Sequence, residues 1–431
     1  MLRSLKLTTV GPAAEMKLDL APRLNLITGD NGLGKSFLLD VAWWALTRNW
    51  SSYPVRPSPE TVRARRKATI GFTYDGKERL REFTSEFIPE DQIWKGGKGR
   101  PANPGLVLYA RVDGGFAVWD PVRNQKNSEA SSRDEAGPAL PSAFVFTAQE
   151  VWDGLKSDDG SRTFCNGLIS DLVSWQRENG PIFEMFKHAL LEMSEGDKEK
   201  LAPGLSFARL SIDDARDIPT IRTGDRPEVP VVVASAAIRR ILGLVYLLVW
   251  AWNEHQRMSE LKGKDPSSQV IFLVDEVECH LHPRWQRAVV PSLMEVVRAM
   301  AESARVQLVV ATHSPLVLAS VEPVFDSEKD AWFDLDLARG TGDVVLEKRA
   351  FVRHGDVSNW LTSEAFDLKS ARSIPAEAAI DEARALLRAK APPSAEEVRR
   401  VDALLRAAAL PDIDPFWVRW SSFAETFEDI E

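Results

Sequence analysis

The sequence predicts an α/β protein with a mainly parallel sheet, an antiparallel side sheet and a helical subdomain. Two kinds of observation indicate this class. Apolar segments at Leu24–Thr28, Val270–Val274 and Val306–Ala311 are separated by helical segments, and Val270–Val274 is unbroken, as in the middle of a parallel sheet. Alternating segments around Asp-Gly turns occur early in the chain, and they predict antiparallel hairpins inserted into the parallel core.

The first half of the chain is expected to begin with strands at Leu5–Val10 and Leu24–Thr28. The helix expected at Lys35–Arg48 is buried, because apolar residues occur on most of its faces. Two hairpins follow, and their strands are Ala68–Tyr74 with Glu78–Phe83 and Leu106–Val112 with Phe116–Trp119. The polar stretch Asn124–Pro138 is interpreted as a linker. Residues 139–229 are expected to be mostly helical.

The second half is expected to alternate again between helices and strands. Its expected elements are a long helix at Ala234–Arg257, a strand at Val270–Val274, a helix from Arg284 to about Ala304, a strand at Val306–Ala311, a hairpin of Trp332–Asp336 with Val344–Ala350, and a C-terminal helical pair. Ser394 and Glu397 form a capping box for the last helix. Two prolines predict a non-helical approach to Phe416, Trp417 and Trp420, which either this chain or a partner is expected to cover.

Composition excludes several classes of protein. The chain has 431 residues and a net charge of -9, so bulk charge does not attract nucleic acid. Cys165 and Cys279 are its two cysteines, which is no disulfide framework and fits the reducing cytoplasm. The longest apolar run, Ile241–Trp252, is shorter than the roughly 20 residues that a membrane span needs. We therefore expect a cytoplasmic protein without a membrane contact.

A phosphate-binding loop follows the second expected strand. The eight residues that match G-x-x-x-x-G-K-[ST] are Gly29, Asp30, Asn31, Gly32, Leu33, Gly34, Lys35 and Ser36. Glycines let backbone N–H groups point at phosphate oxygens, and the helix that starts at Lys35 adds its positive end. Lys35 is expected to reach the β- and γ-phosphates, and Ser36 is expected to ligate Mg²⁺. The motif predicts ATP and Mg²⁺ as cofactors.

Two further apolar strands end in polar residues of the kind that such a loop needs. Asp275 and Glu276 follow Val270–Val274 directly. We expect Asp275 to help hold Mg²⁺ and Glu276 to act as the general base for the attacking water. His313 follows Val306–Ala311 in a polar turn, where it is expected to sense the γ-phosphate.

The motifs together resemble the RecF/SMC/OLD branch of ABC ATPases. The resemblance lies in Asp275-Glu276, in Glu278-Cys279-His280-Leu281-His282-Pro283 and in Thr312-His313-Ser314-Pro315, with Val277 where the family usually has proline. It implies a P-loop ABC ATPase core and two further site residues. Gln149 would sense Mg²⁺ and the γ-phosphate. Ser235 would bind the γ-phosphate of a second subunit in trans, although Ala237 stands where the family usually has glycine.

The resemblance also predicts how the chain is divided. The expected parts are an N-terminal ATPase lobe at 1–150, a helical subdomain at 151–230, a C-terminal ATPase lobe at 231–350, and a helical pair with a tail at 351–431. A homodimer or higher homo-oligomer is implied, because the ATP sites would be completed by a second copy. The segment between Gln149 and Ser235 is too short for the long coiled coil of a structural-maintenance protein.

Three other clusters have competing interpretations. Cys279, His280 and His282 could suggest a metal site, but their spacing is not that of common zinc sites. Asp334 and Asp336 resemble the acid pair of a Toprim nuclease, but alternate acids on a solvent-facing strand are the preferred interpretation. The best candidate patch for nucleic acid consists of Arg63, Arg65, Arg66, Lys67, Trp94, Lys95, Lys98 and Arg100.

The function that the sequence favours is ATP hydrolysis within a bacterial antiviral defence system. Compact ATPases of this kind resemble those of Septu-like systems, where the ATPase is a scaffold for a separate nuclease. Two alternatives remain open. One is a RecF-like DNA-repair ATPase that binds DNA directly. The other is a nucleotide sensor that does not hydrolyse ATP, which the alanine at position 237 leaves possible.

Overall fold

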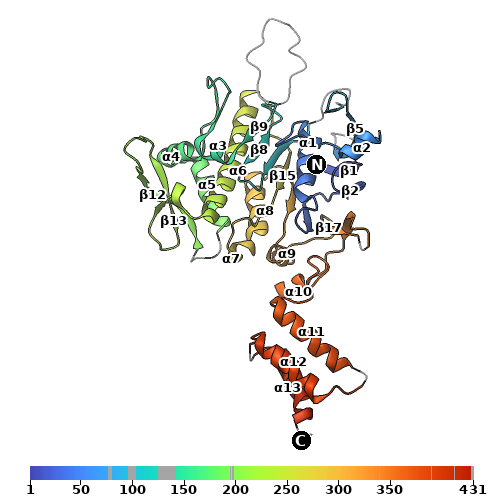
Figure 1. Cartoon of the computed structure of the whole chain (residues 1–431). Helices are drawn as coiled ribbons and strands as arrows, with labels where there is room; N and C mark the ends of the chain where they lie inside the picture. Colours follow the sequence, from blue (N-terminus) through green and yellow to red (C-terminus); the bar gives the residue numbers. More distant parts are fainter. Residues whose placement is uncertain are drawn as a thin grey trace. The chain divides into compact units, whose positions relative to one another are not determined.

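The computed structural model describes residues 1–75, 80–95, 103–124, 142–194, 196, 199–338, 340–389, 391–411 and 413–428. The chain forms two compact units, Met1–Gly355 and Asp356–Glu431 (Figure 1). The linker expected at Asn124–Pro138 falls almost entirely outside the described residues. The finer division of the chain near residues 150 and 230 stays a prediction.

The first unit is built on an eight-stranded mixed sheet. In spatial order its strands are β18 (Val344–Arg349), β17 (Asp330–Leu337), β3 (Leu24–Gly29), β16 (Arg305–Ala311), β15 (Gln269–Val274), β7 (Leu106–Ala110), β8 (Phe116–Trp119) and β9 (Phe144–Phe146). The five strands from β17 to β7 are mutually parallel, and β18, β8 and β9 are antiparallel additions at the two edges. The predicted α/β class with a mainly parallel core is confirmed.

A second, antiparallel sheet lies beside the first, as the early hairpin predicted. Its strands are β2 (Glu15–Asp19), β1 (Leu2–Thr8), β4 (Thr69–Asp75), β5 (Leu80–Ile88) and β6 (Ile93–Trp94). The expected pairing of β4 with β5 occurs, although part of their turn lies outside the described residues. Strand β2 is not among the predicted elements, although its alternation of buried and exposed residues is a clear strand pattern.

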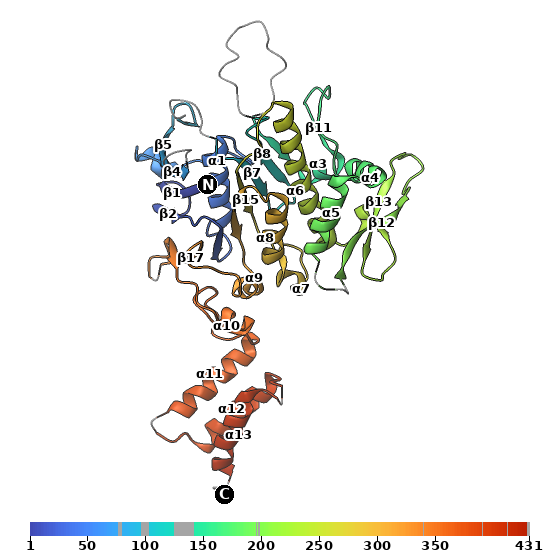
Figure 2. The same cartoon turned by 180° about the vertical axis from the view of Figure 1, so that it is seen from behind.

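Ten helical segments of the first unit are described, and they cover both faces of the central sheet. They are α1 (Lys35–Thr47), α2 (Pro59–Arg63), α3 (Ala148–Asp153), α4 (Leu168–Glu178), α5 (Pro181–Glu192), the 3₁₀ turn η2 (Val231–Val233), α6 (Ala236–Leu261), α7 (Pro283–Gln286), α8 (Val289–Met300) and α9 (Pro315–Val321). Figure 2 shows α1 beside the antiparallel sheet and α6 beside α8.

One hydrophobic core joins α1, the antiparallel sheet and one face of the central sheet. Ile271, Leu273 and Val309 point into this core, whereas Phe272 contacts the ring of Phe116 on the other face. The alternation follows from the two-residue period of a strand. On the other face, α6 packs against β7 and α8 packs against β16. Both faces are therefore covered, which explains why the central strands are apolar throughout.

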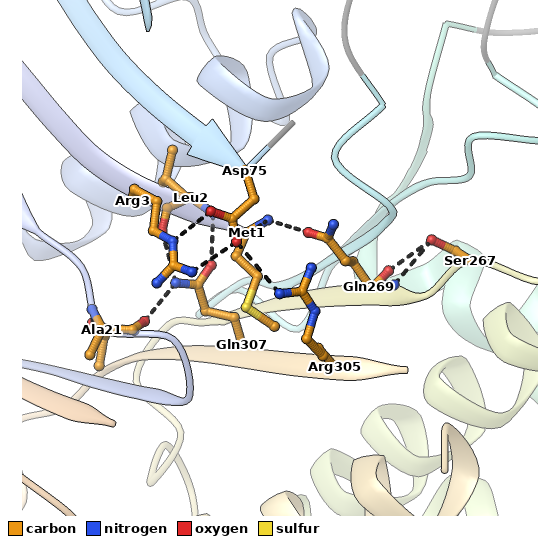
Figure 3. Close-up of polar contacts among 10 residues, drawn as sticks. Met1, Leu2, Arg3, Ala21, Asp75, Ser267, Gln269, Arg305 and Gln307 are labelled. Atoms are coloured by element: carbon orange, nitrogen blue, oxygen red, sulfur yellow. Dashed lines mark hydrogen bonds and ion pairs between the residues drawn. The ribbon is translucent and has the colours of Figure 1, made fainter. Parts of the chain in front are cut away.

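The first residues of the chain are anchored between the two sheets (Figure 3). Gln307 of β16 is fully buried, accepts a hydrogen bond from the Leu2 N–H at 2.9 Å, and donates to the carbonyl oxygens of Leu2 and Ala21. Arg3 and Asp75 form a two-point ion pair across β1 and β4, at 2.7 and 2.9 Å. These contacts satisfy buried polar groups where β1 passes the central sheet.

Helix α6 is the long apolar helix that the sequence predicted, and it lies in the core. Among the described residues it is the one helix long and apolar enough to cross a membrane, and 61% of its most apolar window is buried inside the protein. The helix expected at 284–304 is instead two helices, α7 and α8, with a break at Arg287 and Ala288.

The expectation of a mostly helical stretch at 139–229 is wrong for its second part. That part holds β12 (Leu201–Ala208) with β13 (Ile218–Thr223) and β14 (Val229–Pro230), and the short pair β10 (Leu155–Lys156) with β11 (Thr163–Cys165) already precedes α4. Pro203, Gly204 and Pro219 disfavour a helix, and the β-branched residues of β13 favour a strand. The helical subdomain expected at 151–230 therefore contains a two-stranded and a three-stranded sheet besides α4 and α5.

Asp334 of β17 does not face the solvent, which corrects the preferred interpretation for this acid, whereas Asp336 is partly exposed. Asp334 is buried, accepts a hydrogen bond from the Thr28 hydroxyl at 2.8 Å, and lies 3.7 Å from the guanidinium of Arg349. The cause is the position of β17 beside β3, which sequence periodicity does not reveal.

The second unit holds α10 (Val357–Leu361), α11 (Ile374–Arg388), α12 (Ala395–Ala407) and α13 (Pro415–Glu428). The tail is helical from Pro415, because proline suits the first turn of a helix, so the expected non-helical approach ends there. Phe416 and Trp420 are buried against α11 and α12, and the Trp420 indole donates to Asp402 at 3.0 Å. The unit's own core therefore covers these two rings.

Candidate functional site

The phosphate-binding loop leaves the sheet where β3 ends at Gly29. Gly29, Gly32 and Gly34 have φ angles of 131°, 81° and 106°, which residues with a side chain rarely adopt. At Gly29 a Cβ atom would lie 2.2 Å from the carbonyl oxygen of Leu335, so a side chain has no room there. Helix α1 starts directly after the loop, so its N-terminal N–H groups point toward the loop.

Lys35 lies folded back onto this loop. Its ammonium group donates hydrogen bonds to the carbonyl oxygens of Gly29 and Asp30, each at 2.8 Å. Burial lowers the pKa of Lys35, and the nearby acids Glu276 and Asp275 oppose that shift. The Lys35 ammonium thus lies beside the backbone N–H groups of the loop, and this arrangement suits the binding of a polyphosphate.

Strand order brings three sequence-distant turns to the same edge of the sheet. Because β3, β16 and β15 are adjacent and parallel, the residues after their carboxyl ends meet. The loop follows β3, His313 follows β16 and Asp275 follows β15. His313 therefore occupies the turn between the phosphate-binding loop and the acidic pair.

Asp275 and Ser36 form the part of the site that fits Mg²⁺. Asp275 is 1% exposed and accepts a hydrogen bond from the Ser36 hydroxyl. Its Oδ1 atom is buried and has no hydrogen-bond partner. Burial raises the pKa of Asp275 to about 6, with further contributions from Glu276 and Asp40. A buried carboxylate oxygen without a partner, beside a hydroxyl, is a donor set that suits a hard cation.

Glu276 and His313 face each other across the edge of the sheet. The Nε2 atom of His313 lies 3.6 Å from Oε1 of Glu276, and the ring also bonds to the backbone of Gly29. Burial and the charge of Lys35 lower the pKa of His313, which favours the neutral imidazole. Glu276 has a φ of 44°, an uncommon conformation that turns the chain sharply after Asp275.

Glu278 is a further acid in the same turn. Its Oε1 accepts the backbone N–H of His313 at 2.5 Å, and its carboxylate also bonds to the Thr312 hydroxyl. Its Oε2 atom is buried and has no hydrogen-bond partner. Glu278 belongs to the acidic motif of the sequence, and its position two residues after Glu276 is the signal that marks it as a site residue.

Ser235 lies elsewhere, at the N-terminus of α6, where its hydroxyl accepts a hydrogen bond from the Ile238 N–H. Ser235 and Ala237 line a cavity of about 310 Å³ together with Arg226, Arg284 and Trp285. Trp285 is 6% exposed, and its indole N–H has no hydrogen-bond partner. His282 caps α7 by accepting from the Arg284 N–H at 3.3 Å. The cavity therefore combines a helix N-terminus with Arg284 and with Arg226, which pairs with the lining acid Glu199 at 2.7 Å.

Gln149 is not brought to the phosphate-binding loop. It lies exposed in the first turn of α3, after the edge strand β9, and its side-chain amide bonds to Asp153 on the same helix. β9 is five strands away from β3 in the sheet order. The structure thus assembles Lys35, Ser36, Asp275, Glu276 and His313 in one place and leaves Gln149 and Ser235 at others.

Comparison with known proteins identifies the family. The profile of a family described as "AAA domain, putative AbiEii toxin, Type IV TA system" matches residues 24–319, which is more than half of the chain and includes both acids and His313. The chain belongs to this family. Its membership of the ABC-type P-loop ATPases of the RecF/SMC/OLD-like branch, which the motifs predicted, is confirmed.

Two curated proteins are similar to this ATPase in sequence. The Septu protein PtuA of Bacillus thuringiensis is 21% identical over 327 residues, which cover 73% of this chain and 72% of PtuA. The "Retron Vc95 probable ATPase" of Vibrio cholerae is 41% identical over 51 residues, or 12% of this chain and 9% of that protein.

Among solved structures, the SMC head domain from Thermotoga maritima is 12% identical, with 81% of this chain and 99% of that chain covered and a TM-score of 0.38. The recombination mediator protein RecF is also 12% identical, with 81% and 98% covered and a TM-score of 0.36. At these TM-scores the likeness adds nothing to the argument from motifs and family.

The raised pKa of Asp275 predicts how Mg²⁺ binding by this ATPase depends on pH. The metal binds the ionised carboxylate, so it competes with a proton below pH about 6. We expect the Mg²⁺-dependent part of ATP binding to weaken by up to about tenfold per pH unit below that value and to be flat above it. Calorimetric titrations between pH about 5 and 8 measure it.

The Asp275→Asn variant is the control for this titration, because ATP has a titrating phosphate of its own. The variant should bind Mg²⁺ more weakly and keep only the pH dependence of the nucleotide. A wild-type profile that matches the Asp275→Asn profile would show that Asp275 does not hold the metal.

Proposed function

We propose that this chain hydrolyses ATP and serves as the ATPase and scaffold subunit of a bacterial antiviral defence system, acting with a separate nuclease in the cytoplasm. The observation that carries the ATPase part is the convergence of Lys35, Ser36, Asp275, Glu276 and His313 at one edge of the sheet. Together they supply a phosphate cradle, a metal site, a general base and a hydrogen-bonding group for the γ-phosphate.

The defence part of the proposal is supported by relatives rather than by geometry. The match to the Septu protein PtuA extends over most of both chains, and the retron ATPase shares a shorter segment. We recognise no nuclease motif in the sequence, which agrees with a separate partner that carries the nuclease activity. Turnover of ATP by the purified protein, with and without DNA, tests the ATPase part, and co-purification with the product of a neighbouring gene tests the partner.

A role in direct DNA binding is the alternative that one observation favours. Arg63, Arg65, Arg66 and Lys67 are all exposed, in and after α2, and Lys67 pairs with Glu86 at 3.3 Å. Trp94 does not extend this patch, because it is buried against Trp44 and Phe87, and this corrects the expected patch. Lys95 is exposed, whereas Lys98 and Arg100 lie outside the described residues. Stimulation of turnover by DNA would favour this alternative.

The site is proposed to be completed by a second copy of the chain through Ser235. The cavity beside Ser235 contains Arg284 and lies at the positive end of α6, both of which suit the γ-phosphate of a neighbouring nucleotide. Arg226 also lines it, in an ion pair with Glu199. Ala237 faces the same cavity, so its methyl group would lie where the family usually has glycine. Slow or absent turnover would favour the non-hydrolysing sensor.

The Ser235→Arg variant should bind ATP like the wild type and fail to form an ATP-dependent dimer. The arginine fills the cavity, and the lost helix cap costs about 1 kcal/mol, which the fold tolerates. Sedimentation with ATP and Mg²⁺ measures the effect. Ser174→Arg, at an exposed position of α4, is the matched control and should still associate. Association of Ser235→Arg at the wild-type level would mean that the cavity does not face a second copy.

A further inference from the structure

Glu278 links the acidic turn after β15 to the histidine turn after β16. The two turns have no shared secondary structure beyond the ends of their strands. The link consists of the 2.5 Å hydrogen bond from the His313 N–H to Oε1 of Glu278, and of the bond between the Thr312 hydroxyl and the same carboxylate. Thr312 is fully buried and also accepts a hydrogen bond from the Ser314 N–H at 3.0 Å. One carboxylate therefore holds successive residues of the histidine turn.

The acidic turn that carries Glu278 is itself tightly wound. The Cys279 N–H bonds to the Glu276 carbonyl oxygen, and the Leu281 N–H bonds to the Glu278 carbonyl oxygen, each at 2.9 Å. Glu276 and His280 both have a positive φ. A turn constrained in this way holds the backbone of Glu278 in place. The hydrogen bond from the His313 N–H to its side chain therefore fixes the distance between the two turns.

Burial of the Glu278 carboxylate is energetically unfavourable, which indicates that its hydrogen bonds have a function besides packing. Glu278 is mostly buried, and its Oε2 has no hydrogen-bond partner. Burial raises the pKa of Glu278, and the charge of Glu276 raises it further. A carboxylate is unfavourable in such a place unless its hydrogen bonds are needed.

The His313 ring depends on the backbone that Glu278 holds. The ring spans the gap between the backbone of Gly29, at the start of the phosphate-binding loop, and Oε1 of Glu276 at 3.6 Å. A shift of the His313 backbone would move the ring away from both. Catalytic groups must lie within well under about 1 Å of their productive positions, so such a shift of the His313 ring would lower the rate of ATP hydrolysis.

We propose that Glu278 is a positioning residue that fixes the backbone of His313, and thereby holds the imidazole between the phosphate-binding loop and Glu276. The inference rests on the proposed ATPase function for its kinetic consequence. Its structural content, the hydrogen bond to the His313 amide, stands independently of turnover.

Two variants of similar size distinguish the effect of the Glu278 hydrogen-bond acceptor from the effect of its negative charge. Glu278→Gln keeps an oxygen that accepts from the His313 N–H, whereas Glu278→Met keeps the length of the side chain and removes the acceptor. We expect Glu278→Met to lower kcat by about tenfold or more, with the KM for ATP changed by no more than about twofold. Glu278→Gln should recover most of the lost kcat. Glu278→Ala replaces the methionine variant if that variant does not fold.

Hydrogen exchange of the full-length protein gives the second measurement. The amide of His313 should be protected in the wild type and in Glu278→Gln, and it should exchange faster in Glu278→Met. Equal losses of kcat in both variants, or an unchanged kcat in Glu278→Met, would overturn the proposal. If the wild type hydrolyses no ATP, the proposed function fails, and protection of the His313 amide alone then decides the role of Glu278.

Discussion

The Glu276→Gln variant is expected to lose ATP hydrolysis by a factor of about a hundred or more, the scale of a general base. Glutamine has the shape of glutamate but does not accept the proton of the attacking water. Glu276 lies at the edge of the sheet directly after Asp275, the proposed Mg²⁺ ligand, with Oε1 3.6 Å from the His313 ring. ATP binding should change little, because the phosphate cradle and the metal site stay intact. Single-turnover hydrolysis and equilibrium binding give the two quantities.

The same variant should accumulate the ATP-bound dimer, because the step that releases it is blocked. Sedimentation with ATP and Mg²⁺ measures the dimer, and Ser235→Arg in the same background should abolish it. Glu295→Gln, on the exposed face of α8 where it pairs with Arg298, is the matched control and should keep wild-type turnover. Normal hydrolysis by Glu276→Gln would place the general base on another residue.

The Lys35→Ala variant is expected to lose ATP affinity by about a hundredfold or more. The Lys35 ammonium is the cation at the mouth of the loop, and charge-assisted hydrogen bonds contribute about 1.5–3 kcal/mol each, so two bonds to phosphate oxygens account for such a loss. In the structure the ammonium bonds to the carbonyl oxygens of Gly29 and Asp30. Isothermal titration with ATP measures the affinity.

The fold of the Lys35→Ala variant should be intact, because α1 is held by the apolar core around Trp43 and Leu39 rather than by Lys35. A thermal midpoint close to that of the wild type checks this. Lys329→Ala, which removes an exposed lysine paired with Asp326, should bind ATP normally. Unchanged ATP affinity in Lys35→Ala would remove the phosphate-binding assignment altogether.

Tertiary packing overrides the local pattern at Trp94 and Asp334, whereas the strands of 139–229 follow from local residues. Trp94 was expected to face nucleic acid because basic residues surround it in the sequence, yet its indole donates to the Val55 carbonyl inside the core. Asp334 was expected to face solvent because acids alternate on its strand, yet β17 lies against β3. The second part of 139–229 was expected to be helical, although its prolines and β-branched residues already favoured strands.

The sequence by itself determined the fold class, the phosphate-binding loop and the acidic pair. These features are contiguous: a glycine loop between a strand and a helix, or two acids directly after an apolar strand, have local conformational causes. Only the tertiary structure decided that β16 lies between β3 and β15, that Glu278 holds the His313 amide, and that Asp334 is buried beside Thr28. Such contacts join residues far apart in the chain, and strand order and packing set them rather than the local periodicity of the sequence.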